Sequence, residues 1–202
     1  MWCFSHQIGT LRRYFTGSFG HYATMTDEAI LSELLHTEML LHPRIRDVVE
    51  RFVESRFHRP VIGVHVRFMD RRSRIEHFFG AIDRAKQRAR DGMIFLATDN
   101  KEAERRIRER YGDVFVTEKW FPSSGVSMHQ NPECPDRLNN AIEALVDMYL
   151  LAACDYLVYP GSSTFSQISA LVSDMPRGNI YDIERYDLRI RLKRFVRGLV
   201  TR

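Results

Sequence analysis

Apolar positions change their spacing near residue 60, and the change separates a helical stretch from a series of alternating strands and helices. Before that point, apolar residues recur at helical spacing over 26–42 and again over 43–53, which predicts two consecutive helices. Residues 1–24 carry scattered glycines and aromatic side chains without any period, and we predict irregular structure there.

After residue 60, short runs of β-branched and aromatic residues alternate with helical patterns. The runs predict strands at 61–66, 93–97, 113–116, 155–159 and 178–181. The intervening patterns predict helices at 74–90, 100–111, 137–152, 163–173 and 185–199. Strands and helices that alternate in this way are typical of a Rossmann-like, doubly wound parallel sheet of the α/β class. We therefore expect a small helical N-terminal segment, 1–56, followed by one α/β domain, 57–202.

The composition supports a folded domain and indicates the cellular compartment in which to expect it. With 202 residues and 44% hydrophobic content, the chain can bury a sizeable core. Its three cysteines are scattered and odd in number, which favours neither a disulfide framework nor a zinc site and fits a reducing cytoplasm. No apolar run is long enough to cross a membrane and no signal peptide is recognised, so we expect a cytoplasmic location.

The net charge of +4 is concentrated near the end of the chain. From Arg177 to Arg202, eight Lys or Arg oppose three Asp or Glu. Helix 185–199 is basic and amphipathic, a pattern that either packs its apolar face on its own domain or lies peripherally on an anionic membrane. Because the rest of the chain is nearly neutral, and the arginines of helix 100–111 alternate with glutamates, we expect no nucleic-acid partner.

Polar side chains follow four of the predicted strands, at the edge where ligands of open α/β sheets bind. They are His65, Arg67 and Asp70 after the first strand, Thr98, Asp99 and Asn100 after the second, Thr117, Glu118 and Lys119 after the third, and Gly161, Ser162, Ser163 and Thr164 after the fourth. Arginine is a natural partner for phosphate, and a small-residue loop that enters a helix offers free N–H groups. Taken singly, each has a structural alternative: a core histidine, an ion-paired arginine, or helix caps at Asp99 and the serines. Their convergence on one edge favours an anionic ligand.

The ordered motifs resemble a known family. His65-Val66-Arg67, Leu96-Ala97-Thr98-Asp99-Asn100, the 124–129 loop, and Asp155-Tyr156-Leu157-Val158 with Ser162-Ser163 are similar to the donor-binding half of the α1,6-fucosyltransferases. That group includes the core fucosyltransferase of animals and the rhizobial nodulation fucosyltransferase. The resemblance covers roughly 57–175 and implies the C-terminal, Rossmann-like half of a GT-B glycosyltransferase.

The resemblance implies an inverting, metal-independent enzyme that transfers fucose from GDP-fucose to a glycan or lipid-linked oligosaccharide, with no cofactor. It also implies roles for individual residues. Arg67 would hold the pyrophosphate beside His65 and Asp99, Glu118 would contact guanine, and Ser162 and Ser163 would grip the phosphate. An acceptor hydroxyl needs a general base, for which Asp70 is our first candidate and Glu76 the second.

Four positions depart from the family pattern and leave alternatives open. Phe68 stands where a second basic residue is common, Asn100 replaces an aspartate, Glu118 replaces an aspartate and Thr164 replaces a glutamine. A different GDP-sugar is therefore one alternative. A non-catalytic GDP-binding module without a full acceptor domain is another, and an unrelated Rossmann-like binding protein is a third.

Overall fold

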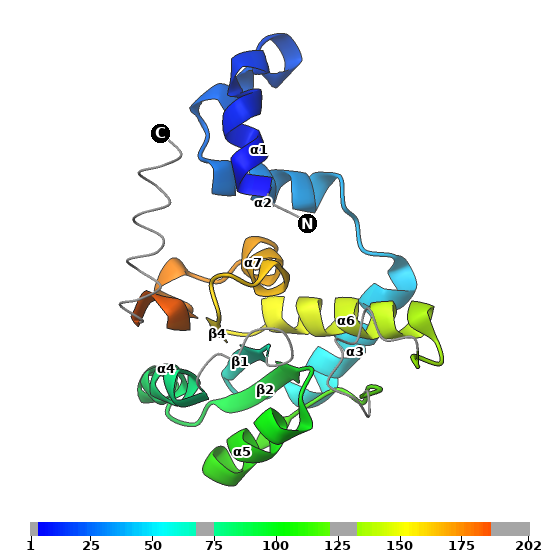
Figure 1. The fold of residues 1–202 in the computed structure, drawn as a ribbon, viewed down its shortest axis with the longest axis vertical. Helices are drawn as coiled ribbons and strands as arrows, with labels where there is room; N and C mark the ends of the chain where they lie inside the picture. Colours follow the sequence, from blue (N-terminus) through cyan, green and yellow to red (C-terminus); the bar gives the residue numbers. More distant parts are fainter. Residues whose placement is uncertain (1–3, 68–74, 122–132, 187–202) are drawn as a thin grey trace. The chain divides into compact units, whose positions relative to one another are not determined.

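The computed structural model of the protein describes residues 4–67, 75–121 and 133–186 (Figure 1). They belong to two compact units, residues 1–42 and 43–202. The boundary lies before the predicted one at residue 56, because the helix over 43–56 packs with the sheet rather than with the N-terminal helices.

Most of the described residues of the first unit are helical, so the prediction of irregular structure over 1–24 is wrong, whereas the helix predicted from residue 26 is present. Helix α1 (Phe4–Leu11) and two 3-10 turns (Arg12–Tyr14 and Gly17–Thr24) precede α2 (Asp27–Thr37). The side chains of Ile8 and Ile30 are buried, and Arg12 pairs with Asp27. Helix α1 has eight residues and the 3-10 turns are short or glycine-containing, so this part of the sequence shows no clear helical period.

The second unit is built on a sheet of five parallel strands in the order β3-β2-β1-β4-β5. The strands are β1 (Val61–Val66), β2 (Met93–Thr98), β3 (Val114–Phe115), β4 (Tyr156–Tyr159) and β5 (Ile180–Asp182). The strand order reverses between β1 and β4, which is the arrangement of a doubly wound sheet. The predicted fold class is therefore confirmed.

Helices cover both faces of this sheet (Figure 1). One face carries α4 (Ile75–Arg88) and α5 (Lys101–Tyr111). The other carries α3 (Pro43–Arg56), α6 (Arg137–Ala152) and α7 (Thr164–Leu171). Side chains alternate along β1, so Ile62, Val64 and Val66 pack toward α4 whereas Val61 packs toward α6.

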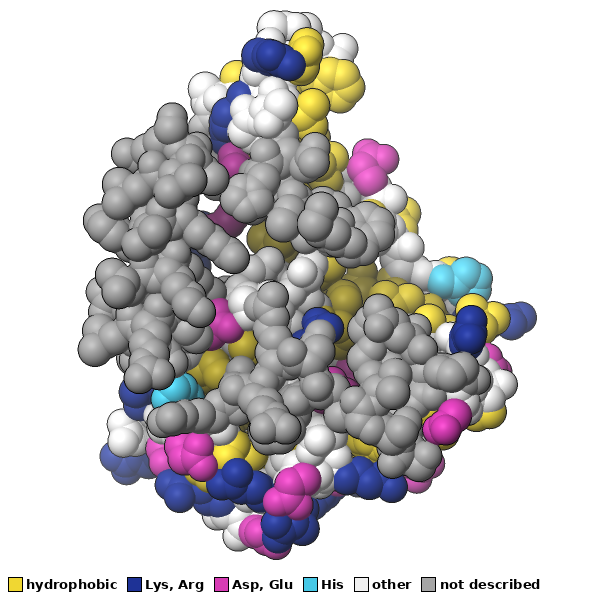
Figure 2. Space-filling model, in the orientation of Figure 1, with side chains coloured by type: hydrophobic (Ala, Val, Ile, Leu, Met, Phe, Trp, Pro, Cys, Tyr) yellow, Lys and Arg dark blue, Asp and Glu magenta, His cyan; other side chains and the backbone are white. Residues whose placement is uncertain are grey.

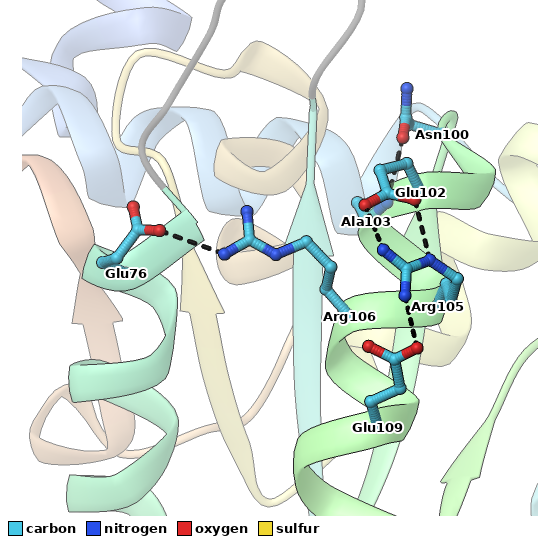
Figure 3. Close-up of polar contacts among 7 residues, drawn as sticks. All are labelled: Glu76, Asn100, Glu102, Ala103, Arg105, Arg106 and Glu109. Carbon is cyan, nitrogen blue, oxygen red and sulfur yellow. Dashed lines mark hydrogen bonds and ion pairs between the residues drawn. The ribbon is translucent and has the colours of Figure 1, made fainter.

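The N-terminus of α5 corrects one local prediction. Asn100, rather than Asp99, caps this helix, because its side chain accepts a hydrogen bond from the backbone N–H of Ala103 at 2.9 Å (Figure 3). The N-cap position of α5 therefore belongs to Asn100, and Asp99 precedes it by one residue.

The exposed face of α5 carries local ion pairs, as its sequence predicts. Arg105 bonds to Glu102 and Glu109, and Arg106 reaches Glu76 on α4 at 3.1 Å (Figure 3). In the space-filling view, Lys and Arg are interleaved with Asp and Glu over this part of the surface (Figure 2). Neutralised in this way, the arginines form no basic stripe.

Several limits differ from the predicted ones. Strand β3 spans two residues rather than 113–116, and β5 lies at Ile180–Asp182 rather than 178–181. A 3-10 turn, Ile183–Tyr186, occupies the start of the predicted tail helix, and 187–202 lie outside the described residues. Within the described part of the chain, no helix is both long and apolar enough to cross a membrane.

Candidate functional site

A pocket of about 200 Å³ lies at the carboxyl edge of the sheet. It collects side chains from the ends of three strands and from the two helices above them. The lining residues are His65, Arg67, Ala97, Thr98, Asp99, Lys119, Asn140, Glu143, Ala144, Asp147 and Phe165. The strand order reverses beside β1, the position at which open α/β sheets hold their ligands.

His65 is held as a neutral ring in the wall of this pocket. Its side chain is buried, its Nδ1 atom hydrogen-bonds the hydroxyl of Ser166 on α7, and its ring centre lies 4.8 Å from that of Phe165. Burial, with smaller contributions from the positive charges of Arg67 and Lys119, lowers the pKa of His65 to about 3. The imidazole is therefore uncharged at neutral pH and offers one N–H and one lone pair.

A buried ion pair forms the wall opposite the strands. The ammonium of Lys119, from the loop after β3, pairs with Asp147 on α6, and the two side chains are 5% and 7% exposed. The hydroxyl of Thr117 donates a further bond of 2.6 Å to Asp147 Oδ1. The pocket lining as a whole carries two positive side chains, Arg67 and Lys119, and three carboxylates, those of Asp99, Glu143 and Asp147.

Glu143 brings an acceptor atom into the pocket from the same face of α6. Its Oε1 accepts a bond of 2.6 Å from the side-chain amide of Asn139. Its Oε2 is buried and has no hydrogen-bond partner among the described residues. A buried acceptor of this kind is costly unless a ligand or water donates to it.

Two buried carboxylates accept hydrogen bonds from the turn between β4 and α7. Asp182 Oδ1 accepts from the N–H of Gly161 at 2.8 Å, and Glu184 accepts from the hydroxyl of Ser162. The hydroxyl of Ser163 is buried and has no partner within the described part of the chain. Neither serine lines the pocket.

The structure thus brings together only some of the residues selected from the sequence. His65, Arg67 and Asp99 line one pocket, whereas Glu118 is exposed and lies outside its lining. Asp70 and the 124–129 loop fall outside the described residues, and Glu76 is an exposed partner of Arg106.

Helix α6 supplies a wall that sequence reasoning missed. Asn140, Glu143 and Asp147 lie three and four positions apart, so they share one face of this helix. Three polar residues at helical spacing on a helix that must pack on a sheet are the signal that would have found them.

Comparison with known proteins agrees with this geometry. Residues 22–190 match the family described as Nodulation protein Z (NodZ). The chain belongs to the NodZ family. It is 29% identical over 159 residues to nodulation protein Z of Azorhizobium caulinodans, a match that covers 70% of this chain and 48% of that protein. Nodulation protein Z of Bradyrhizobium diazoefficiens is 27% identical over 139 residues, covering 61% of this chain and 36% of that protein.

Two solved structures extend the comparison. The crystal structure of NodZ α1,6-fucosyltransferase soaked with GDP-fucose is 26% identical, with a TM-score of 0.53, and the match covers 75% of this chain and 47% of that one. The POFUT1 structure in complex with GDP has a TM-score of 0.52 at 13% identity over 77% of this chain and 50% of that one, a likeness of fold alone. The predicted resemblance to the NodZ group is confirmed. The NodZ-family chain described here spans about half the length of the curated relatives it matches.

Proposed function

We propose that this chain forms the GDP-sugar-binding half of an inverting, metal-independent fucosyltransferase, which transfers fucose from GDP-fucose to a hydroxyl of a glycan or lipid-linked oligosaccharide. The observation that carries the proposal is the meeting of His65, Arg67 and Asp99 in one pocket at the ligand-binding edge of a parallel sheet. Support also comes from membership of the NodZ family and from the likeness to a NodZ structure soaked with GDP-fucose.

The chemistry of the pocket suits a departing nucleoside diphosphate. When the bond to the sugar breaks, negative charge develops on the β-phosphate, and in the proposed mechanism the guanidinium of Arg67 stabilises that charge. The neutral ring of His65 stands beside it in the same wall. Asp70, which follows the first strand closely in the sequence, is our proposed general base for the acceptor hydroxyl.

Recognition of guanine requires an acceptor for its two adjacent N–H donors. Glu118, the residue indicated by the resemblance, is exposed and outside the pocket lining. Glu143 and Asp147 are carboxylates that do line it, and Glu143 Oε2 has no partner among the described residues. We therefore propose that α6 contributes to base recognition. The ratio of GDP affinity to ADP affinity, measured in Glu118→Gln, Glu143→Gln and Asp147→Asn, shows which of these carboxylates recognises the base.

Calorimetric titration of the chain with GDP, GDP-fucose, UDP and ADP, in the presence of EDTA, tests donor binding. We expect GDP and GDP-fucose to bind and UDP and ADP to bind far more weakly. Arg67→Ala should abolish binding while the circular dichroism spectrum is unchanged. The matched control is Arg106→Ala, because Arg106 is a surface arginine that pairs with Glu76 and lies outside the pocket. Equal affinity for all four nucleotides, or unchanged affinity in Arg67→Ala, contradicts the assignment.

Sugar transfer is tested separately from binding. Release of GDP from GDP-fucose should rise when an acceptor oligosaccharide is added. GDP binding without acceptor-dependent release of GDP by this chain would instead support the alternative of a donor-binding module.

A further inference from the structure

Ser166 on α7 makes a contact for which the proposed mechanism has no role so far. Its side chain is fully buried, and its hydroxyl hydrogen-bonds the Nδ1 atom of His65. The preceding residue, Phe165, lies against the face of the same ring, with the two planes inclined by 32°. Two successive residues of α7 therefore fix the imidazole, one through an edge nitrogen and the other across its face.

The other ring nitrogen is left for the pocket. Nε2 of His65 has no hydrogen-bond partner among the described residues, and the side chain belongs to the pocket lining. Because the ring is neutral, either Nε2 or Nδ1 carries the proton, but not both. Nε2 therefore presents a donor to the pocket if the Ser166 hydroxyl donates to Nδ1, and an acceptor if Nδ1–H donates to that hydroxyl.

The burial of Ser166 decides between the two tautomers. Within the part of the chain that the structure describes, its hydroxyl has no partner other than His65. If Nδ1–H donated to the hydroxyl, the hydroxyl proton would be left without an acceptor in a fully buried place, which is costly. If the hydroxyl donates to Nδ1, that proton is satisfied and Nε2–H opens onto the pocket.

We propose that Ser166 is a positioning residue that donates its hydroxyl proton to Nδ1 of His65 and so holds Nε2–H toward the pocket, beside Arg67, as an uncharged donor for a phosphate oxygen. The identity of that ligand rests on the proposed function, whereas the tautomer does not. An uncharged donor adds a directed bond without a second positive charge next to the arginine.

The tautomer is tested first, on the full chain without ligand. The histidine ring nitrogens are labelled with ¹⁵N, the His65 signals are assigned from their loss in His65→Ala, and two-bond ¹H–¹⁵N couplings report which nitrogen is protonated. We expect the Nε2–H form at pH 7. A predominant Nδ1–H form overturns the proposal, whatever the chain binds.

The linkage to binding is tested with a matched pair of variants. Ser166→Ala removes the hydroxyl that contacts His65. Ser169→Ala makes the same change one turn later on α7, at an equally buried residue whose hydroxyl, among the described residues, donates to the backbone carbonyl of Phe165 at 3.3 Å and does not contact His65. We expect GDP affinity to fall about tenfold in Ser166→Ala, the effect of one hydrogen bond, and to change less than about twofold in Ser169→Ala.

A double-mutant cycle distinguishes positioning from general damage to the fold. If Ser166 acts through His65, Ser166→Ala should cause no further loss of affinity in a His65→Ala background. Additive losses, or equal losses from Ser166→Ala and Ser169→Ala, contradict the proposal. If the wild-type chain fails to bind GDP, the proposed function fails, and the tautomer measurement still decides the role of Ser166.

Discussion

Among the glycines that the structure describes, Gly161, in the turn between β4 and α7, is the one where an added methyl group would make the closest contacts. A Cβ atom at residue 161 would lie 2.6 Å from Oδ1 of Asp182 and closer still to its Cγ and Oδ2 atoms. Carbon and oxygen atoms do not approach so closely without a shift. Because Asp182 is 7% exposed and the clash is with the carboxylate itself, the alanine must push this group away.

The displaced carboxylate makes two hydrogen bonds that hold the turn. Oδ1 of Asp182 accepts from the N–H of Gly161 at 2.8 Å and from the N–H of Glu184 at 2.9 Å. Hydrogen bonds to a charged group contribute about 1.5–3 kcal/mol each, so loss of both predicts a decrease of about 3 kcal/mol or more in the free energy of unfolding.

Urea unfolding followed by circular dichroism measures this loss, and Gly80→Ala is the matched control. Gly80 lies on the exposed side of α4, and a Cβ there meets nothing within 4 Å. Alanine is the better helix former, so the control should gain roughly 0.5–1 kcal/mol. A loss below about 1 kcal/mol in Gly161→Ala, or equal losses in both variants, would show that Asp182 does not brace the turn.

Three further predictions follow from burial and capping. Asn100→Ala should lower the free energy of unfolding by about 1 kcal/mol through loss of the α5 cap, with Asn100→Asp as the rescue, both measured in urea. Lys119→Met should lower the free energy of unfolding by about 3–5 kcal/mol because it leaves the buried carboxylate of Asp147 without its cation, and combination with Asp147→Leu should recover most of that loss. Because the pKa of His65 is lowered to about 3 in the folded chain, between pH 6.5 and 3 the histidine is protonated in the unfolded chain but not in the folded one. The free energy of unfolding should therefore be unaffected by this group above pH 6.5 and should fall as the pH is lowered, by about 2 kcal/mol at pH 5. His65→Asn should remove this part of the pH dependence of unfolding; an unchanged slope contradicts it.

The parallel sheet was predictable because buried parallel strands leave a strong pattern in the sequence. Strand β1 is buried at every position, and such a strand consists of β-branched residues with little alternation in polarity. Helix α2 was also predictable from its apolar spacing and its start at Thr26, whereas α1 and the two 3-10 turns before it were not. The eight residues of α1 are too few to show a helical period in the sequence.

The third strand shows why the site was only partly predictable. The sequence brings Glu118 and Lys119 to the edge of the sheet, but β3 is two residues long. Side-chain alternation cannot be carried from so short a strand to residues several positions beyond it. In the structure Lys119 turns into the pocket, where Asp147 from α6 compensates its charge, and Glu118 remains exposed. Which of the two side chains enters the pocket therefore depends on a contact with α6, which lies farther along the chain.

The two-residue spacing of His65 and Arg67 explains why this strand end can serve an anion. Side chains alternate along β1, so residues 65 and 67 share the face that α6 and α7 cover, while Val66 between them enters the core against α4. His65 pairs in register with Ala97 on β2, and two positions farther along each chain come Arg67 and Asp99. Moving the histidine by one residue would direct it into the opposite core, away from Ser166 and the pocket. The strand therefore fixes where the imidazole and guanidinium emerge, and α7 fixes the orientation of the ring.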